Sequence, residues 1–444
     1  MSEQQAALTG REFQAAEGTD DWRVLGQDAL AWFATASHAD GARLVRRVAD
    51  LVEGPDAPDL DDGRTPDLPD IDLRARGVRI RLRRPGDRFT PREVELARAV
   101  SAAAADLGLT TDAAPLQLVQ VGLDAQDRAA LLPFWQRVLG HEQVGDRVLR
   151  DPERRLPSLW FQEQDAPRPL RNRLHLDVVT VPPEAAAVLA EVPGLGGQVP
   201  RENDYYATIA DADGNEADVL PLPDGAADWD GEATADWRLV FAAVARYPTV
   251  SVAQAVELVE RVAALADGAG LALGVDLRPG LVILDSGKDL WEMVEGYAAL
   301  AASCQQVARG LGLVADVAGP RFVQVGIDAV DVPGVRAFWA AALGYVEDPR
   351  EDVTDLVHPH QLTMPVFLQS LDADDHERRA QRNRLHLDVF VPDDLARARV
   401  DAALAAGGRV THVAGAPAWW TLADPEGNEV CIAVSPGREE LWGE

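Results

Sequence analysis

The chain has 444 residues, of which 73 are acidic and 42 are Lys or Arg, so its formal net charge at pH 7 is −31. Such an acidic chain is repelled by phosphate backbones and anionic lipid surfaces, which argues against nucleic-acid and membrane partners. With 47% hydrophobic residues, only two cysteines and no signal-peptide pattern at its start, it is expected to be a multidomain globular protein of the reducing cytoplasm.

Five short motifs occur twice, in the same order along the chain. The spacing between partners is 204 to 215 residues, so the copies differ mainly in the lengths of their loops. The chain is therefore a tandem duplication. The paired motifs occupy residues 21–23 and 236–238, 119–122 and 323–326, 134–135 and 338–339, 172–178 and 383–389, and 214–216 and 427–429.

The first part of each copy is predicted to form an antiparallel sheet covered by helices. In copy one, apolar residues at helical spacing predict a helix over 40–53, and a Thr-Pro-x-Glu start at Thr90 predicts another to about 107. Between them, apolar residues alternate with arginines through 78–83, which is the period of a half-buried strand. Copy two repeats this order, with predicted elements at 252–267, 281–284 and 289–310.

The alternating strand also creates a basic stripe in an otherwise acidic chain, made of Arg79, Arg81, Arg83 and Arg84. Two interpretations of this stripe stay open. It could bind an anionic ligand, or it could be a sheet face whose arginines pair with acids of the loop 56–62.

The second part of each copy has a different order of elements. Within each second part, the order strand, helix and three strands occurs roughly twice. Two such halves predict curled sheets around a cleft. In copy one the predicted elements are 116–123, 128–139, about 148, 159–162, 173–181, 184–189, 205–210 and 216–220, and copy two has the same order over 320–435.

Residues 116–222 and 320–435 resemble vicinal-oxygen-chelate modules of the glyoxalase, bleomycin-resistance and dioxygenase superfamily. The resemblance rests on the Val-Gln-Val-Gly strand, the Phe-Trp helix ending in Leu-Gly, the Arg-Leu-His-Leu-Asp strand and the Gly-Asn-Glu ending. Residues 1–110 and 233–313 resemble pterin-4a-carbinolamine dehydratase modules, mainly in the order of their elements.

These resemblances imply an α+β fold with four modules, internally duplicated: two dehydratase-like helix-on-antiparallel-sheet modules and two glyoxalase-like βαβββ-pair modules. Equivalent modules are expected to pair about internal pseudo-two-fold axes, which favours a monomer or a weak homodimer. The module boundaries that we expect are 1–110, 116–222, 233–313 and 320–435.

The glyoxalase resemblance implies a ligand cleft in each module and a divalent metal ion as the cofactor. The implied metal ligands are Gln120, His175, Asp218, Gln324, His386 and Glu429. The expected cleft further includes Glu216. Strand alternation adds one ring of each aromatic pair, Tyr206 and Trp420, although these rings could equally be part of the ordinary core. Cys431 occupies the position in copy two that Asp218 occupies in copy one.

Half-sites from different copies could combine, with Gln120 beside His386 and Glu429, or Gln324 beside His175 and Asp218. Alternatively, both histidines could be hydrogen-bonded core residues. The repeated Asn-Arg-Leu-His-Leu-Asp segment could also be a folding element in which Arg173 pairs with Asp177.

The leading function is small-molecule binding in the glyoxalase-like clefts, as a metal-dependent lyase or isomerase. The first alternative is a non-catalytic sequestering protein of the resistance type. The second is 4a-hydroxytetrahydrobiopterin dehydratase, although the histidines that this chemistry requires are absent near Asp67 and Arg83. Whether the protein is an enzyme stays open at this stage.

Overall fold

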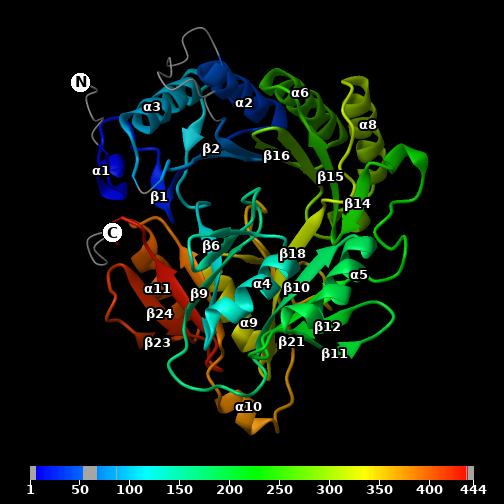
Figure 1. Ribbon diagram of the computed structural model, residues 1–444. Helices are drawn as coiled ribbons and strands as arrows, with labels where there is room; N and C mark the ends of the chain where they lie inside the picture. Colours follow the sequence, from blue (N-terminus) through cyan, green and yellow to red (C-terminus); the bar gives the residue numbers. More distant parts are fainter. Residues whose placement is uncertain (1–6, 54–67, 87, 437, 439–444) are drawn as a thin grey trace. The chain divides into compact units, whose positions relative to one another are not determined.

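The computed structural model describes residues 7–53, 68–86, 88–436 and 438. The chain divides into two compact units, each assembled from separate stretches of sequence. Unit 1 comprises residues 1–116, 228–320 and 435–444, and unit 2 comprises residues 117–227 and 321–434. The first part of each copy thus lies in unit 1 and the second part of each copy in unit 2 (Figure 1). In the described part of the chain, no helix is long and apolar enough to cross a membrane.

Within the described residues, unit 1 contains one sheet of nine strands, and both copies contribute to it. The main strand order is β1-β2-β4-β3-β16-β17-β15-β14, and β5 pairs with β2. The strands are β1 (Arg23–Leu25), β2 (Asp28–Ala34), β3 (Asp70–Arg74), β4 (Gly77–Leu82), β5 (Thr110–Thr111), β14 (Trp237–Val240), β15 (Ala242–Pro248), β16 (Gly274–Arg278) and β17 (Leu281–Asp285).

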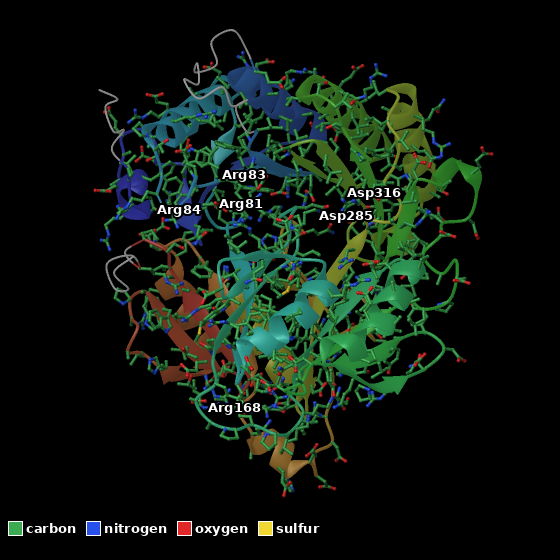
Figure 2. The ribbon with its side chains drawn as sticks, in the orientation of Figure 1. Arg81, Arg83, Arg84, Arg168, Asp285 and Asp316 are labelled. Atoms are coloured by element: carbon green, nitrogen blue, oxygen red, sulfur yellow. The ribbon has the colours of Figure 1, made fainter. Side chains whose placement is uncertain are left out.

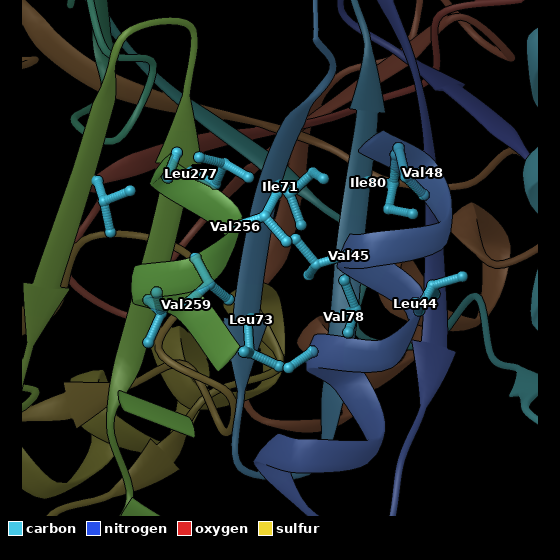
Figure 3. Close-up of a cluster of buried hydrophobic side chains, with 14 of the residues drawn as sticks. Leu44, Val45, Val48, Ile71, Leu73, Val78, Ile80, Val256, Val259 and Leu277 are labelled. Atoms are coloured by element: carbon cyan, nitrogen blue, oxygen red, sulfur yellow. The ribbon is translucent and has the colours of Figure 1, made fainter. Parts of the chain in front are cut away.

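Helices cover one face of this sheet. Alternate strand residues such as Ile71 and Val78 point to this side, where they pack with Val45 and Val256, which lie on one long helix from each copy (Figure 3). The predicted helix-on-sheet layer is therefore observed. The helices of unit 1 are α1 (Gly10–Gln14), α2 (His38–Glu53), α3 (Pro91–Asp106), α6 (Val252–Ala269), α7 (Leu290–Met293), α8 (Tyr297–Gly310) and the short 3₁₀ helix η2 (Glu232–Thr234).

One predicted helix is interrupted. Residues 289–310 were expected to form a single helix, but α7 ends at Met293 and α8 begins at Tyr297. Between them Val294 is extended and Gly296 has a φ of 103°, a conformation that breaks the helix and that glycine adopts without steric cost.

The copies meet in the centre of the nine-stranded sheet, where β3 pairs with β16. Asp72 lies opposite its equivalent Asp276 in this register, and like charges in that position repel each other. Arginines offset the repulsion, because Arg79 and Arg278 each contact Asp72 at 2.6 Å and Arg74 contacts Asp276 at 2.6 Å. Burial opposes the charged form of Asp72, but Arg278 and Arg79 hold its pKa well below the ordinary value.

The basic stripe is paired with acids on neighbouring strands. Arg79 contacts Asp72, Arg81 contacts Asp28 at 2.5 Å, and Arg83 lies 3.8 Å from Asp70. Figure 2 shows Arg81, Arg83 and Arg84 together on this part of unit 1. The loop 56–62, from which the acids were expected, lies outside the described residues, so strand acids account for the pairs that the structure shows.

His38 also joins the copies within unit 1. Asp267, from α6 of copy two, accepts hydrogen bonds from the backbone N–H groups of His38 (3.0 Å) and Ala39 (2.8 Å), and it contacts His38 Nδ1 at 2.8 Å. Asp267 thus satisfies donors at the start of α2 that the helix itself leaves unpaired. His38 Nε2 accepts a bond from the backbone N–H of Leu273, so the imidazole is fully engaged.

Unit 2, whose residues are all described, contains two eight-stranded sheets. We call them the β6 sheet, with order β23-β24-β25-β22-β6-β9-β8-β7, and the β18 sheet, with order β11-β12-β13-β10-β18-β21-β20-β19. The strands of the β6 sheet are β6 (Leu118–Ala125), β7 (Glu142–Val144), β8 (Val148–Arg150), β9 (Ser158–Glu163), β22 (Leu385–Phe390), β23 (Arg409–His412), β24 (Trp419–Ala423) and β25 (Glu429–Ala433).

The β18 sheet has the equivalent composition with the copies exchanged. Its strands are β10 (Leu174–Thr180), β11 (Gln198–Glu202), β12 (Ala207–Ala210), β13 (Glu216–Leu220), β18 (Arg321–Ala329), β19 (Val346–Glu347), β20 (Leu356–Val357) and β21 (Val366–Ser370). The central antiparallel pairs, β6 with β22 and β10 with β18, both join different copies. Each sheet is therefore half copy one and half copy two.

The helices of unit 2, except the short and exposed α10 (His376–Ala380), pack on the apolar side of these sheets. Phe134 and Trp135 of the repeated Phe-Trp motif are buried in the hydrophobic core of the unit, as are Phe338 and Trp339. These elements are α4 (Arg128–Leu139), α5 (Pro182–Glu191), α9 (Val332–Leu343), α10 (His376–Ala380), α11 (Ala396–Ala405) and the 3₁₀ helix η1 (Val192–Leu195).

Two buried arginines hold the exchanged halves together. Arg173 donates through Nε to Asn428 Oδ1 of copy two at 2.9 Å, and Arg384 donates through Nε to Asn215 Oδ1 of copy one at 2.7 Å. Each side chain is only 1% exposed. Arg173 therefore does not pair with Asp177, the alternative considered for the repeated heptapeptide (residues 172–178 and 383–389). It makes contacts between the copies instead.

The other repeated motifs extend this network. Asn215 donates to Asp211 at 2.8 Å, and the same carboxylate accepts the indole N–H of Trp135 at 2.8 Å. In copy two, Asn428 and Trp339 make the equivalent bonds to Asp424. The Phe-Trp, Asn-Arg and Gly-Asn-Glu motifs are thus parts of one buried arrangement, formed twice.

Replacing Arg384 with Ala is expected to lower the free energy of unfolding by about 1–3 kcal/mol, because the buried amide oxygen of Asn215 would lose its donor, as would the partly buried carbonyl oxygens of Leu170 and Gly214. Chemical denaturation of the full chain measures this loss. Arg397→Ala, on the exposed face of α11, is the matched control and should leave the transition midpoint unchanged. Equal midpoints for the two variants would contradict the assigned role of Arg384.

Replacing Asp267 with Ala should cost about 1 kcal/mol at pH 7, the usual effect of losing a helix cap. Burial opposes ionisation of Asp267, but bonds from Ala39 and His38 lower its pKa. Its contribution is therefore complete above the unfolded-state pKa of about 3.9 and is lost as the pH falls through the lower folded-state value. Denaturation of the unaltered protein and of the Asp267 variant, measured from pH 7 down through about pH 4, tests this pH dependence. The difference in unfolding free energy between the two proteins should shrink on acidification, and a difference that grows would refute the assignment.

Candidate functional site

Each sheet of unit 2 has one apolar and one polar face, because side chains alternate along a strand. On β18, Val323, Val325 and Ile327 enter the hydrophobic core. The intervening Gln324, Gly326 and Asp328 lie on the opposite face, where Gln324 and Asp328 bond to other polar groups. The polar face of each sheet is the candidate site.

Three side chains gather on the polar face of the β18 sheet: His175, Asp177 and Asp218. Each has one potential ligand atom, and these atoms lie within 4.8 Å of one another. His175 and Asp177 come from β10, and Asp218 is placed beside Asp177 by the parallel pairing of β10 with β13. Thr208 donates its hydroxyl to Asp218 at 2.6 Å and so fixes the carboxylate.

Gln324 completes this group from the other copy. Its Nε2 donates to Asp177 Oδ2 at 2.8 Å across the β10–β18 pair. Asp177 Oδ1 and Gln324 Oε1 are both buried and accept no hydrogen bond. Asp177 Oδ1 lies 3.5 Å from His175 Nε2, an ion-pair distance. The structure thus brings together the predicted residues His175, Asp218 and Gln324, and adds Asp177.

The glycine of the repeated Val-Gln-Val-Gly motif makes room for the histidine. A Cβ on Gly326 would lie 2.3 Å from Cε1 of His175, and one on Gly122 would lie 2.3 Å from Cε1 of His386. Each ring lies directly over the glycine of the neighbouring strand. Only a residue without a side chain permits this approach.

Nearby charges shift the pKa values of this group. Burial disfavours a charged imidazole, but the negative charge of Asp177, whose Oδ1 lies 3.5 Å from Nε2, outweighs it and raises the pKa of His175. Burial raises the pKa of Asp218, and the bond from Thr208 opposes the shift. Imidazole, carboxylate and amide oxygen together form a donor set suited to a divalent cation.

The β6 sheet has an equivalent group with one change. His386, Asp388 and Cys431 place their ligand atoms within 4.8 Å of one another, and Gln120 lies opposite Asp388 in the strand register. The indole N–H of Trp160 donates to Asp388 Oδ2 at 2.7 Å. Burial and the neighbouring Asp388 raise the pKa of the Cys431 thiol.

Glu216 and Glu429 lie outside both groups. Arg171 contacts Glu216 at 2.5 Å, and Arg382 contacts Glu429 at 2.7 Å. Glu429 was predicted to be a metal ligand, but its carboxylate is held by this ion pair. In the β6 sheet Cys431, two residues further along the strand, joins the histidine instead.

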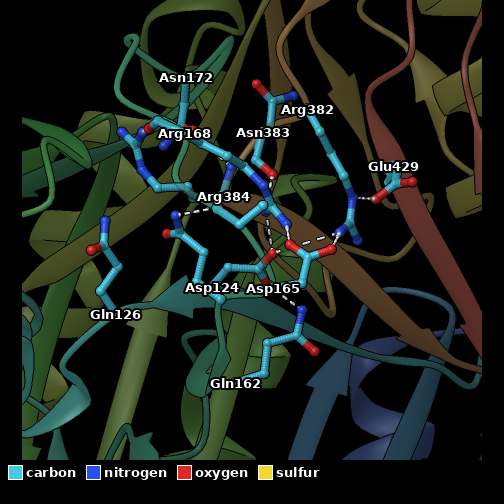
Figure 4. Close-up of polar contacts among 12 residues, drawn as sticks. Asp124, Gln126, Gln162, Asp165, Arg168, Asn172, Arg382, Asn383, Arg384 and Glu429 are labelled. Atoms are coloured by element: carbon cyan, nitrogen blue, oxygen red, sulfur yellow. Dashed lines mark hydrogen bonds and ion pairs between the residues drawn. The ribbon is translucent and has the colours of Figure 1, made fainter.

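A cluster of ion pairs continues along the polar face of the β6 sheet. Asp124 accepts bonds from Gln162 and Arg168, and Arg382 reaches from Glu429 toward Asp165, 3.5 Å away (Figure 4). The β18 sheet repeats this pattern around Asp328, which is bonded to Gln369 and Arg378. Both faces therefore carry paired charges beside the histidine group.

The two aromatic residues expected in the cleft, Tyr206 and Trp420, lie in different surroundings. Tyr206 is half-buried in the turn before β12, with its backbone N–H bonded to Asn203 Oδ1 at 2.9 Å. Trp420 packs against the hydrophobic core, as in the second of the two interpretations that the sequence left open. The reason is strand parity, because Trp420 is displaced by one residue from Thr421, the neighbour of Cys431.

Asp177 and Asp388 were missed as candidate site residues. The signal was present in the repeated His-Leu-Asp sequence, since residues two apart on a strand share a face. Trp160 was also missed, because its position depends on the pairing of β9 with β6 and its bond partner belongs to the other copy.

A family model described as a glyoxalase-like domain matches residues 120–220 and 324–433. These two stretches contain the histidine groups of both sheets. The chain carries a glyoxalase-like domain in two segments. The predicted α+β duplication is confirmed for this glyoxalase-like part. No curated protein matches the chain.

Several solved structures are similar to the chain at low identity. Glyoxalase I from Zea mays has a TM-score of 0.36 and 10% identity, covering 73% of this chain and 95% of its own. A putative dioxygenase from Bacillus subtilis subsp. subtilis str. 168 has a TM-score of 0.36 and 9% identity, covering 72% and 84%. A glyoxalase/bleomycin resistance protein/dioxygenase family enzyme from Burkholderia phytofirmans PsJN has a TM-score of 0.21 and 19% identity, covering 25% and 96%. These likenesses are too weak to support an argument about function.

Replacing Gly326 with Ala in the glyoxalase-like domain should displace the ring of His175, at a cost of about 1–3 kcal/mol in unfolding free energy for the overpacked site. Gly194→Ala is the control, since a Cβ there meets no atom within 4 Å. Denaturation midpoints of both variants test this. Equal stability would show that the histidine does not need the glycine.

Proposed function

We propose that the glyoxalase-like domain binds an oxygen-bearing small molecule on the polar face of the β18 sheet, together with a divalent cation. The cation would be held by His175, Asp177, Asp218 and Gln324. The observation that carries this proposal is the group of His175, Asp177 and Asp218, whose ligand atoms lie within 4.8 Å of one another, together with the buried Oε1 of Gln324, which receives no hydrogen bond.

Buried polar atoms nearly always have partners, because an unsatisfied buried acceptor costs about 1–3 kcal/mol. Here Gln324 Oε1 is such an atom, and Asp177 Oδ1 accepts no hydrogen bond and lies 3.5 Å from the imidazole Nε2 of His175. Gln324 directs its only donor group, Nε2, to Asp177 Oδ2, which leaves Oε1 as an acceptor. A cation would satisfy both oxygens at once.

The chain's own residues fix the ligand atoms in position. Thr208 orients Asp218, Gln324 orients Asp177, and Gly326 admits the ring of His175. When bound, a divalent cation supplies Lewis-acid polarisation of a carbonyl or hydroxyl oxygen of the small molecule. This role fits a lyase or isomerase, the reaction classes that the sequence resemblance implies.

The dehydratase alternative has less support from the site residues. His38 is the only histidine in the sequence of unit 1, and both of its ring nitrogens already make hydrogen bonds. General acid–base catalysis by clustered histidines requires more than this single, engaged imidazole. We therefore assign unit 1 a scaffold or binding role.

Metal binding tests the proposal directly. Equilibrium dialysis of the full chain against Mn²⁺ should show a site whose affinity falls by more than about tenfold in His175→Ala and in Asp218→Asn, since even outer-shell changes cost that much. His412→Ala, an exposed residue of β23, is the control and should bind as the unaltered protein does.

Unchanged Mn²⁺ affinity in both site variants would overturn the proposed cation site. A co-purified small molecule that binds equally well after metal removal would instead support the sequestering alternative. Mass spectrometry of the protein before and after chelator treatment separates these outcomes.

A further inference from the structure

The equivalent groups of the two sheets differ in one ligand atom. At the position where the β18 sheet has the carboxylate of Asp218, the β6 sheet has the thiol of Cys431. The remaining members, a histidine and an aspartate two residues further along the strand, are the same in both. Because the backbone frameworks are equivalent, this substitution changes the chemistry of the site more than its shape.

We propose that the polar face of the β6 sheet is a second metal site, selective for a thiophilic divalent cation such as Zn²⁺, with His386, Asp388 and Cys431 as ligands. A thiolate is a soft donor that favours zinc over manganese or magnesium, whereas carboxylate and amide oxygens favour the harder ions. The two faces of the glyoxalase-like domain then hold different metals.

Neighbouring residues prepare the three side chains for this role. Trp160 holds Asp388 Oδ2 at 2.7 Å, and Asp388 Oδ1 lies 3.6 Å from His386 Nε2. Thr421 Oγ1 lies 3.4 Å from Cys431 Sγ and steadies the thiol. His386 and Asp388 are 7% and 8% exposed, so water competes little for them.

The aromatic residue beside the aspartate also differs between the two sheets. Trp160 donates a hydrogen bond to Asp388, a function that its equivalent Phe367 cannot perform for Asp177. In the β18 sheet, the hydrogen bond to the aspartate comes from Gln324 Nε2 instead. Three protein ligands with nitrogen, oxygen and sulfur donors match the usual zinc set and leave a fourth tetrahedral position open.

Cobalt(II) provides the test, because thiolate coordination to Co²⁺ gives a near-ultraviolet charge-transfer band that oxygen and nitrogen ligands do not give. The full chain, reduced and loaded with Co²⁺, should show this band. Cys431→Asp, which recreates the donor set of the β18 sheet, should lose the band and lower Zn²⁺ affinity by more than about tenfold. Cys304→Ala, which removes the other thiol, should keep it.

The result that overturns the inference is a band that survives in Cys431→Asp, or no band in the reduced, Co²⁺-saturated protein. Cys431→Ser guards against misfolding of the aspartate variant, with unfolding midpoints as the check, and should also lose the band. Asp218→Asn separates this inference from the proposed function. That variant should lose the Mn²⁺ site and retain the cobalt–thiolate band, so either site can fail without the other.

Discussion

The buried guanidinium groups of Arg173 and Arg384 determine how unit 2 is assembled. Each crosses to the other copy and donates to an asparagine that also belongs to the Asp–Trp network of that copy. Because a buried charge must find partners, this geometry favours the exchange of half-sheets over any arrangement within one copy. The candidate sites follow from the exchange, since Gln324 reaches Asp177 across the β10–β18 pair, which joins the two copies.

The repeated heptapeptide divides into two parts with different tasks. Its Asn-Arg half lies in the network between copies, where Asn172 and Asn383 accept bonds from the backbone of the opposite arginine. Its His-Leu-Asp half lies on β10 or β22 and presents two side chains to the polar face. The identity of the two heptapeptides therefore reflects both the fold and the site, rather than one of them alone.

Much of this could be predicted from the sequence, because periodicity and paired motifs are local signals. The duplication, the helix α2, the capped start of α3 and the alternating strand β4 were all visible. What could not be predicted was which copy supplies each strand neighbour, since register and partner depend on buried contacts between distant residues. That limit explains why the sequence could not identify the partners of Arg173 or decide which face of its strand Trp420 occupies. The break before α8 depends on the left-handed backbone of Gly296, which helical spacing does not reveal.

The exchange of half-sheets has an evolutionary consequence. A protein with one copy would have to form the same strand pairs with a second molecule, and its two sites would be identical by symmetry. Fusing the copies into one polypeptide removes that constraint, since a mutation then alters one site and spares the other. The aspartate at position 218 and the cysteine at position 431 record such a divergence, which an assembly of identical subunits could not acquire.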